Sequence, residues 1–279
     1  MIEFNHVGFG YTQKKNLYKD LQMNLQAGSI YGLLGRNGAG KSTLLKLITG
    51  LVFAKRGKVS VLGDNPAKRH PSFLQKIFFI PEEIDTPDID VLSFAEDFKP
   101  FYPNFDKQQF IGLLHEMEVP QTKLSQMSYG QKKKTWIALG ISANTELLIL
   151  DEPTNGLDIP SKRQFRKMIA STINDNRCII ISTHQVRDLD SLIDRILVVE
   201  NGELLVNSSI DTITSKLHFK QLKDDYPSDN VLYSESNLLG TSAVLLNNGG
   251  ESAFSRIDIE LFFNAVMANK QQMQSLFTA

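Results

Sequence analysis

Residues 35–43 read GRNGAGKST and fit G-x-x-x-x-G-K-[ST], the pattern of a loop that binds phosphates. The apolar run SIYGLL, residues 29–34, precedes the loop, and LLKLITGLV, residues 44–52, follows it with helical spacing. Glycines let the main chain curl until several N–H groups point at phosphate oxygens, and the beginning of a helix adds the positive end of its dipole. A strand, a phosphate loop and a helix therefore follow one another in the order that phosphate binding requires.

Two side chains of this loop carry the chemistry. Lys41 would supply a cation to the outer phosphates, and Ser42 would offer a hydroxyl to magnesium. A glycine-rich turn that binds nothing would need neither group at this spacing. The predicted nucleotide-binding residues of the loop are Gly35, Arg36, Asn37, Gly38, Ala39, Gly40, Lys41, Ser42 and Thr43.

A pair of carboxylates follows a buried strand further along the chain. In ELLILDE, residues 146–152, apolar residues lead directly into Asp151 and Glu152, and two acids at that place are costly without a purpose. Ligands gather at the carboxyl ends of parallel strands, so we expect Asp151 to hold magnesium, directly or through water, and Glu152 to polarise an attacking water. The alternative, in which both acids only cap the strand, is disfavoured by the phosphate loop upstream.

The segment MSYGQKKK, residues 127–134, resembles the signature motif of ABC ATPases, Leu-Ser-Gly-Gly-Gln. It keeps the serine, the second glycine and the glutamine, as Ser128, Gly130 and Gln131. The resemblance implies that these residues bind the terminal phosphate of a nucleotide held by another subunit, at the N-terminus of a helix that Ser128 caps. A serine and a glycine at a helix start are alone an ordinary cap. Their position between the two other motifs favours the signature.

Three further matches to ABC ATPases come in the expected order. Tyr11 resembles the aromatic residue that stacks on adenine, NGLD at 155–158 the loop after the catalytic acid, and His184 the switch histidine. Tyr11 or His184 alone would usually be structural, so their order along the chain carries the argument. The resemblance covers about residues 1–215, and the chain looks most like the stand-alone ATPase subunits of bacterial exporters of the bacitracin-resistance kind. IDIELFF, residues 257–263, is also similar to that subgroup.

One departure from the family pattern has chemical content. Where most of the family has a glutamine, FIPEE at 79–83 puts Glu82. A carboxylate ligates magnesium more strongly than an amide, yet it adds negative charge near the terminal phosphate. Glu83 is the alternative residue that could point inward. The basic run Lys132–Lys134 is interpreted as a solvated helix face.

The pattern along the chain predicts an α/β protein of three parts. The resemblance implies a P-loop NTPase core with a mixed, largely parallel sheet in an ATPase domain at 1–215. Helical stretches replace the strand pattern and predict an inserted helical subdomain at about 82–146, and short strands with an apolar helix predict a small C-terminal α+β domain at 216–279. Aromatic residues at near-helical spacing in the helical subdomain are expected to be core more often than partner contacts; they are Phe94, Phe98, Phe101, Tyr102 and Phe105.

Composition excludes several classes of function. With 279 residues, a formal net charge of −1 and a pI near 6.5, the chain lacks the basic balance of a nucleic-acid-binding protein. Its single cysteine, Cys178, can form no internal disulfide and is expected to be a buried small hydrophobe. No apolar run reaches the roughly 18 residues of a membrane helix and the N-terminus has no signal-peptide layout, so we expect a cytoplasmic chain, peripheral on the inner face of the membrane.

Taken with the resemblance, these features predict an ATP- and magnesium-dependent motor subunit of an ABC transporter, working through a separate permease. Two copies, or this chain and another ATPase subunit, would form a head-to-tail dimer with ATP between the phosphate loop of one and Ser128 of the other. A soluble ABC ATPase acting on ribosomes or DNA is the alternative; such proteins carry two ATPase units or a long coiled coil, whereas this sequence has one phosphate loop and no heptad run. A regulatory module without turnover is disfavoured because Lys41, Asp151, Glu152 and His184 are all present.

Overall fold

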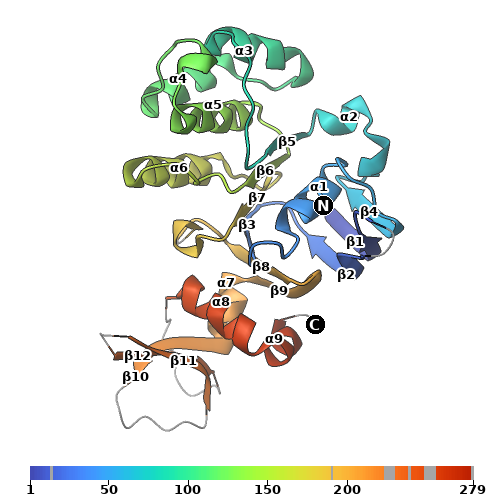
Figure 1. Cartoon of the computed structure of the whole chain (residues 1–279), viewed down its shortest axis with the longest axis vertical. Helices are drawn as coiled ribbons and strands as arrows, with labels where there is room; N and C mark the ends of the chain where they lie inside the picture. Colours follow the sequence, from blue (N-terminus) through green and yellow to red (C-terminus); the bar gives the residue numbers. More distant parts are fainter. Residues whose placement is uncertain (13–14, 190, 223–229, 238–239, 248–255, 278–279) are drawn as a thin grey trace.

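The structure, a computed structural model, describes residues 1–12, 15–189, 191–222, 230–237, 240–247 and 256–277. Its parts are stacked along one long axis, with a helical segment at one end, a central sheet, and the C-terminal elements at the other end (Figure 1). The central sheet has the strand order β5 (Ile77–Ile80), β6 (Leu147–Asp151), β7 (Cys178–Thr183), β3 (Ser29–Leu34), β8 (Arg195–Glu200) and β9 (Glu203–Ser209). All neighbours in this sheet are parallel except β8 and β9, so the predicted mixed, largely parallel sheet is confirmed.

The central strands are apolar throughout because both faces of the sheet are covered. Every residue of β6 and β7 is buried, including Cys178, as expected. Side chains alternate between two hydrophobic cores: Leu147 and Ile149 face α1 (Lys41–Ile48) and the N-terminal strands, while Leu148 and Leu150 face α5 (Tyr129–Ser142) and α6 (Ile159–Thr172). The sheet therefore fixes the phosphate loop and the two acids in one rigid layer.

A second, antiparallel sheet stands beside the first and carries the segment with Tyr11. Its order is β2 (Tyr18–Leu25), β1 (Ile2–Phe9) and β4 (Arg56–Val61), and alternating residues of these strands pack on α1. Short helical segments also lie in the connections between the longer elements of the chain; they are Pro66–Lys68, α2 (Pro71–Leu74), Lys99–Phe101, Leu124–Gln126 and Val186–Leu189.

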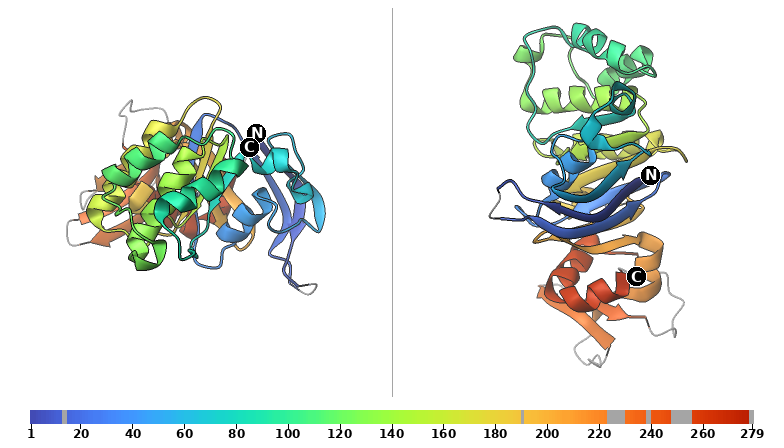
Figure 2. Two further views of the ribbon diagram at one scale, coloured as in Figure 1. Left: turned by 90° about the horizontal axis from the view of Figure 1, so that it is seen from above. Right: turned by 90° about the vertical axis from the view of Figure 1, so that its right-hand side faces the viewer.

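The helical segment between β5 and β6 contains α3 (Val91–Phe98), α4 (Lys107–Glu116) and α5, and it projects away from the sheet (Figure 2). Of its aromatic residues, Phe94 is buried against Phe98 and Trp136, as expected for core. Phe101 differs, because it is 66% exposed. No helix of the described residues is long and apolar enough to cross a membrane.

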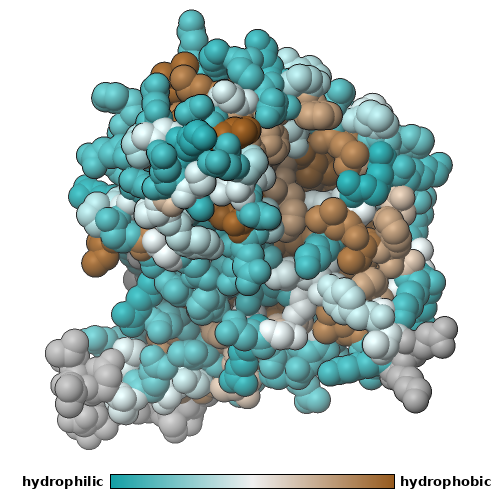
Figure 3. Space-filling model, turned by 45° about the horizontal axis from the view of Figure 1, so that its top comes forward, coloured by the Kyte–Doolittle hydropathy of each residue, from teal (hydrophilic) through white to brown (hydrophobic). Residues whose placement is uncertain are grey.

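Phe101 contributes to an apolar groove between the helical segment and the part that bears α1 and α2. The groove has a volume of about 520 Å³ and includes Leu51, Leu74 and Phe79 among its lining residues. Hydrophobic side chains gather in a hollow on the face of the molecule that Figure 3 shows. Leu51 and Phe53, on the turn after α1, are also about half exposed.

The C-terminal elements form a small α+β unit. After α7 (Ile210–Lys216), the strands β10 (Leu217–Leu222), β12 (Gly240–Leu246) and β11 (Val231–Asn237) form an antiparallel sheet, followed by α8 (Ile259–Ala268) and α9 (Lys270–Phe277). Helix α8 packs on β11 and β12 and also on the turn 186–189, while α9 packs on β9. Residues of both sides share one hydrophobic core, so the predicted division at 215/216 stays a prediction. Helices α6, α7 and α9 were not predicted from the sequence, since each contains few large apolar residues and so shows only a weak helical pattern.

Candidate functional site

The loop at residues 35–43 has the backbone of a phosphate cradle. Gly38 and Gly40 have φ values of 79° and 114°, in the region that favours glycine, and a Cβ on Gly35 would lie 2.4 Å from the carbonyl oxygen of Val199. Helix α1 begins at Lys41 with no side-chain cap, because its N-cap residue is Gly40. The first N–H groups of the helix are therefore left for another acceptor.

Tyr18 stabilises the loop by a direct hydrogen bond, a role that the sequence patterns did not indicate. Its hydroxyl donates a hydrogen bond of 2.9 Å to the carbonyl oxygen of Gly40, and a Cβ on Gly40 would lie 2.6 Å from that hydroxyl. Burial, and in second place the neighbouring Tyr11, raises the pKa of Tyr18 well above its ordinary value. Tyr18 therefore stays a hydrogen-bond donor, and only the fold brings it to a loop that lies far from it in sequence.

A cavity of about 540 Å³ opens over the loop, a size that suits a small molecule. It brings most of the predicted site residues together from five separate stretches of sequence. Gly35, Ala39 and Asp151 are not among its lining residues. The lining consists of Tyr11, Thr12, Lys15, Leu17, Arg36, Asn37, Gly38, Gly40, Lys41, Ser42, Thr43, Glu82, Glu152 and His184.

Lys41, Glu152 and His184 form a charged cluster at the inner end of this cavity. The Lys41 ammonium donates to the carbonyl oxygen of Gly35 at 2.8 Å and lies 3.7 Å from Oε1 of Glu152. Oε1 of Glu152 also lies 2.9 Å from Nδ1 of His184, and Oε2 accepts a bond of 3.3 Å from the main-chain N–H of His184. The carboxylate is thus oriented by two partners while it faces the space where outer phosphates would lie.

Glu152 has an unusual backbone. Its φ is 47°, in the left-handed region, and its side chain is only 4% exposed. Strain of this kind persists where the surroundings hold it, and it is frequent at active sites. The Glu152 N–H donates to both the carbonyl oxygen and the hydroxyl of Ser182, each at 3.1 Å, so β7 holds the turn in place.

Asp151 lies behind the cavity lining. It is buried at the end of β6, where the hydroxyl of Ser182 donates to its Oδ1 in a very short hydrogen bond. Among the described residues, no group of three or more His, Cys, Asp or Glu side chains could hold a metal. Magnesium bound to a nucleotide needs only one or two protein oxygens, with phosphates and water completing its shell. Ser42 lines the cavity and offers a hydroxyl, and the carboxylate of Asp151 lies behind that lining, so both are oxygen donors of the kind that magnesium takes.

Glu82 and Glu83 differ in position. Glu82 lines the cavity, and its Oε1 accepts a bond of 3.3 Å from the side-chain amide of Asn155. Glu83 is not among the lining residues. Of the two, Glu82 is therefore the one that faces the cavity.

The expectation that Lys132–Lys134 form a solvated helix face is wrong for Lys133. Lys133 is fully buried, and its ammonium donates to the carbonyl oxygen of Glu82 at 2.8 Å. Burial lowers the pKa of Lys133, while Glu82, Asp151 and Glu152 act in the opposite direction. Helix α5 turns Lys133 toward β5 and the core, a direction that the run of three lysines does not reveal.

Ser128, Gly130 and Gln131 do not line the cavity of their own chain. They form the N-terminus of α5, where the Ser128 hydroxyl accepts from the N–H of Gln131 at 3.3 Å and the Gln131 side chain accepts from the N–H of Ser128 at 2.9 Å. This capping box stabilises the helix start. Because the Ser128 hydroxyl is an acceptor in this bond, its own proton is free for a further acceptor.

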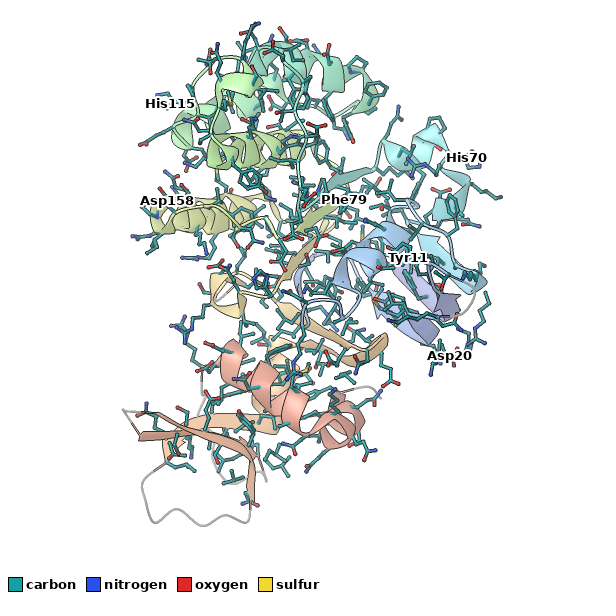
Figure 4. All side chains as sticks on the ribbon, viewed as in Figure 1. Tyr11, Asp20, His70, Phe79, His115 and Asp158 are labelled. Carbon is teal, nitrogen blue, oxygen red and sulfur yellow. The ribbon has the colours of Figure 1, made fainter. Side chains whose placement is uncertain are left out.

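Tyr11 lies at the mouth of the cavity, beside α1 (Figure 4). Tyr11 is 64% exposed, and its ring meets that of Phe9 edge-on, with ring centroids 5.0 Å apart. The hydroxyls of Tyr11 and Thr43 are 3.1 Å apart. The exposed ring is available to stack on a planar group bound in the cavity.

Comparisons with known proteins agree with these observations. A family model described as "ABC transporter" matches residues 18–155. The chain is 30% identical to the ABC transporter ATP-binding protein YtrB of Bacillus subtilis, over 75% of this chain and 69% of that protein. It is 32% identical to the bacitracin transport ATP-binding protein BcrA of Bacillus licheniformis, over 70% of this chain and 66% of that protein. A dimeric ATP-binding cassette in a post-hydrolysis state, bound to ADP and phosphate, has a TM-score of 0.66 at 20% identity and covers 75% of this chain and 99% of its own; it shares the fold.

Proposed function

Because this chain belongs to the ABC transporter family and is an ATPase, we propose that it is the motor subunit of an exporter, working as a head-to-tail dimer with a separate permease. The observation that carries the proposal is the cluster of Lys41, Glu152 and His184 at one end of the cavity over the phosphate loop. A fixed cation and an oriented carboxylate at that place suit the hydrolysis of a terminal phosphate. The similarity to BcrA, a relative named for bacitracin transport, supports the hypothesis that this chain serves an exporter.

In this proposal each residue of the site has one task. Lys41 and the loop N–H groups bind the outer phosphates, Tyr11 stacks on adenine, and Ser42 and Asp151 hold magnesium. Bound magnesium would neutralise charge on the β- and γ-phosphates. Glu152 accepts the proton of the attacking water, and His184 keeps that carboxylate oriented through the contacts at 2.9 and 3.3 Å.

The dimer is proposed because the site of one chain is incomplete. Ser128 is exposed at the N-terminus of α5 with its proton unused, away from the cavity of its own chain. A second copy in head-to-tail orientation would bring the Ser128 hydroxyl and the first N–H groups of α5 to the terminal phosphate. The same arrangement would serve with a different ATPase subunit as partner.

The permease is proposed to dock in the apolar groove that Phe101, Leu51 and Phe79 line. Phe101 is 66% exposed, and exposed apolar residues of this size gathered in a hollow favour a protein partner. A segment of the permease that extends from the membrane would cover it. The chain would then be peripheral on the cytoplasmic face of the membrane.

Co-purification tests this proposal. The tagged chain, expressed in its own host, should retain an integral membrane protein after detergent extraction and show ATPase activity. A Leu51→Asp/Phe101→Asp variant should lose that membrane protein and keep its affinity for ATP, because neither residue lines the nucleotide cavity. An ATPase that fractionates without any membrane protein, or with ribosomes or DNA, would contradict the transporter assignment.

A further inference from the structure

Two of the positions at which the site departs from the family pattern are in direct contact. Tyr129 stands where the signature has its first glycine, and Glu82 stands where most of the family has glutamine. The Tyr129 hydroxyl donates a hydrogen bond of 2.9 Å to the main-chain carbonyl oxygen of Glu82. Burial, and then the nearby Glu82 and Glu83, raises the pKa of Tyr129, so this hydroxyl keeps its proton.

Lys133 strengthens the same connection one helical turn later. Residues 129 and 133 lie on one face of α5, and the Lys133 ammonium donates to the carbonyl oxygens of Glu82 at 2.8 Å and Pro81 at 3.4 Å. A fully buried ammonium is costly unless its protons are used, so these bonds hold the lysine and the loop firmly to each other. The main chain that carries Glu82 is thus bonded twice to the first turns of α5.

The contact continues toward the other loops of the cavity. A Cβ on Gly156 would lie 2.9 Å from the Tyr129 ring, so the ring packs closely on the loop at 155–158. In that loop, Asn155 donates to the Glu82 carboxylate and accepts a bond of 3.3 Å from the side chain of Gln185, which follows His184. The start of α5, Glu82 and the segment of His184 are therefore linked by consecutive polar and packing contacts.

We propose that Tyr129 and Lys133 are positioning residues that fasten the main chain at Glu82 to α5, so that the Ser128 end of the helix and the Glu82 carboxylate at the cavity move as one body. The inference rests on the proposed function, because the connection affects catalysis only when Ser128 contacts the nucleotide of a second subunit. Contact at Ser128 then displaces Glu82 in the cavity of the same chain. Neither the Tyr129 nor the Lys133 side chain lines the nucleotide cavity of its own chain, so both act through Glu82.

The variants can separate this role from general stability. Tyr129→Phe keeps the ring on Gly156 and removes only the hydroxyl. Lys133→Met keeps the length of the side chain and removes a buried charge, a replacement that a well-packed interior tolerates. The matched control is Lys134→Met, which removes a comparable bond of 3.0 Å from α5 to a carbonyl oxygen, that of Met117.

Two measurements report on the connection. In the full chain carrying Tyr129→Phe and Lys133→Met together, the Kd for ATP should stay within about twofold of wild type, while kcat falls about 10- to 100-fold, as for a catalytic group misplaced by up to about 1 Å. Trp136, the single tryptophan of the chain, lies on α5 and packs on Phe78 of β5 and on Phe94 of α3. ATP should change its fluorescence in the wild type and in Lys134→Met, and this change should be lost in the double variant.

The outcomes distinguish the inference from the function on which it rests. A wild-type chain that neither hydrolyses ATP nor dimerises with it would refute the proposed function. If the wild type does both, the inference is overturned by a double variant with unchanged kcat, by an ATP response of Trp136 that survives in it, or by an equal loss of kcat in Lys134→Met. A weakened Kd at unchanged kcat would also overturn it, because that result would make the two residues part of the binding fold.

Discussion

At the scale of single residues, Glu152 has a strained backbone, and its buried carboxylate is held in one orientation. Its φ of 47° turns the carboxylate from the end of β6 toward Lys41 and His184, and Ser182 holds the turn from the neighbouring strand. This fixed orientation suits the proposed role of Glu152, in which the carboxylate accepts a proton from the attacking water. A glutamine at position 152 has the same shape and would keep the orientation of the side chain, but its amide is not a base and could not accept the proton.

Glu152→Gln should therefore slow ATP hydrolysis by about 10²- to 10⁴-fold, the usual contribution of a positioned general base. ATP affinity should be kept, and size-exclusion chromatography with ATP and magnesium should reveal a trapped dimer. The control is Glu146→Gln, at the exposed opposite end of β6. If size-exclusion chromatography shows only monomer and the rate of phosphate release is unchanged, both the proposed dimer and the proposed role of Glu152 are wrong.

Tyr11→Ala should weaken ATP binding by about 1–3 kcal/mol if the exposed ring stacks on adenine. Tyr11→Phe keeps the ring and loses only the contact with the Thr43 hydroxyl, so its ATP affinity should stay near that of wild type. Titration with tripolyphosphate provides the comparison, because it has no base. An equal loss of tripolyphosphate affinity in Tyr11→Ala would assign the tyrosine a structural role.

At the scale of elements, the conformation of the phosphate loop depends on contacts with neighbouring strands of the fold. Gly40 has a φ of 114° and lies under the Tyr18 hydroxyl, while Gly35 lies against the carbonyl of Val199 on β8. The loop is consequently held by β2 and β8 as well as by its own sequence. It presents N–H groups to the cavity because no side chain caps the first turn of α1.

Gly40→Ala should distort the loop, since alanine is strained at this φ and its Cβ would lie 2.6 Å from Tyr18 Oη. We expect ATP binding to weaken by about 1–3 kcal/mol, the cost of one such backbone strain. Calorimetry with ATP measures it. The control, Gly112→Ala, places a methyl group in open space on α4 and should leave Kd unchanged. Equal ATP affinity in both variants would exclude a conformational requirement at Gly40.

At the scale of the whole molecule, the C-terminal elements are built into the core of the ATPase. Phe262 of α8 and Met273 of α9 are fully buried, in the same hydrophobic core as Val206 of β9. Lys270 pairs with Glu200 at 3.4 Å, and Arg187, close after His184, pairs with Glu260 of α8 at 2.5 Å. The second pair is largely exposed, so packing rather than charge dominates this contact.

A shared core predicts one cooperative unfolding transition for the full chain. Phe262→Ala should lower the free energy of unfolding by about 3–5 kcal/mol, the cost of a buried phenylalanine. ATP should raise the melting temperature of that same transition, because it binds only the folded state. Calorimetry that resolves two transitions, of which ATP shifts only one, would instead support independent domains divided at 215/216.

Truncation after Lys216 should leave ATP affinity intact, because none of the residues that the structure describes beyond 216 lines the nucleotide cavity. Its melting temperature should fall, since β9 and the turn 186–189 lose the helices that cover them. A cooperative melt is required before affinity is compared. A folded truncation that binds no ATP would show that the C-terminal elements contribute to the site, while retained binding with lost dimerisation would make them an assembly element.

The sequence by itself determined the phosphate loop, the buried strands and the order of the site motifs. These features are local: the glycines at 35–40 permit the positive φ values that the loop adopts, and continuous apolar runs such as CIIIST at 178–183 are typical of a strand covered on both faces. The strands predicted before the phosphate loop and before the two acids were confirmed as β3 and β6, in the predicted mixed, largely parallel sheet.

Only the tertiary structure decided which side chains meet. Tyr18 and Ser182 reach the site from other strands, Lys133 is buried although its neighbours in the basic run are partly exposed, and the C-terminal helices join the ATPase core. Each of these contacts joins segments far apart in the chain, where periodicity carries no information about the partner. Their energy depends on the packing of several elements at once, so local patterns fix the elements and packing fixes the site.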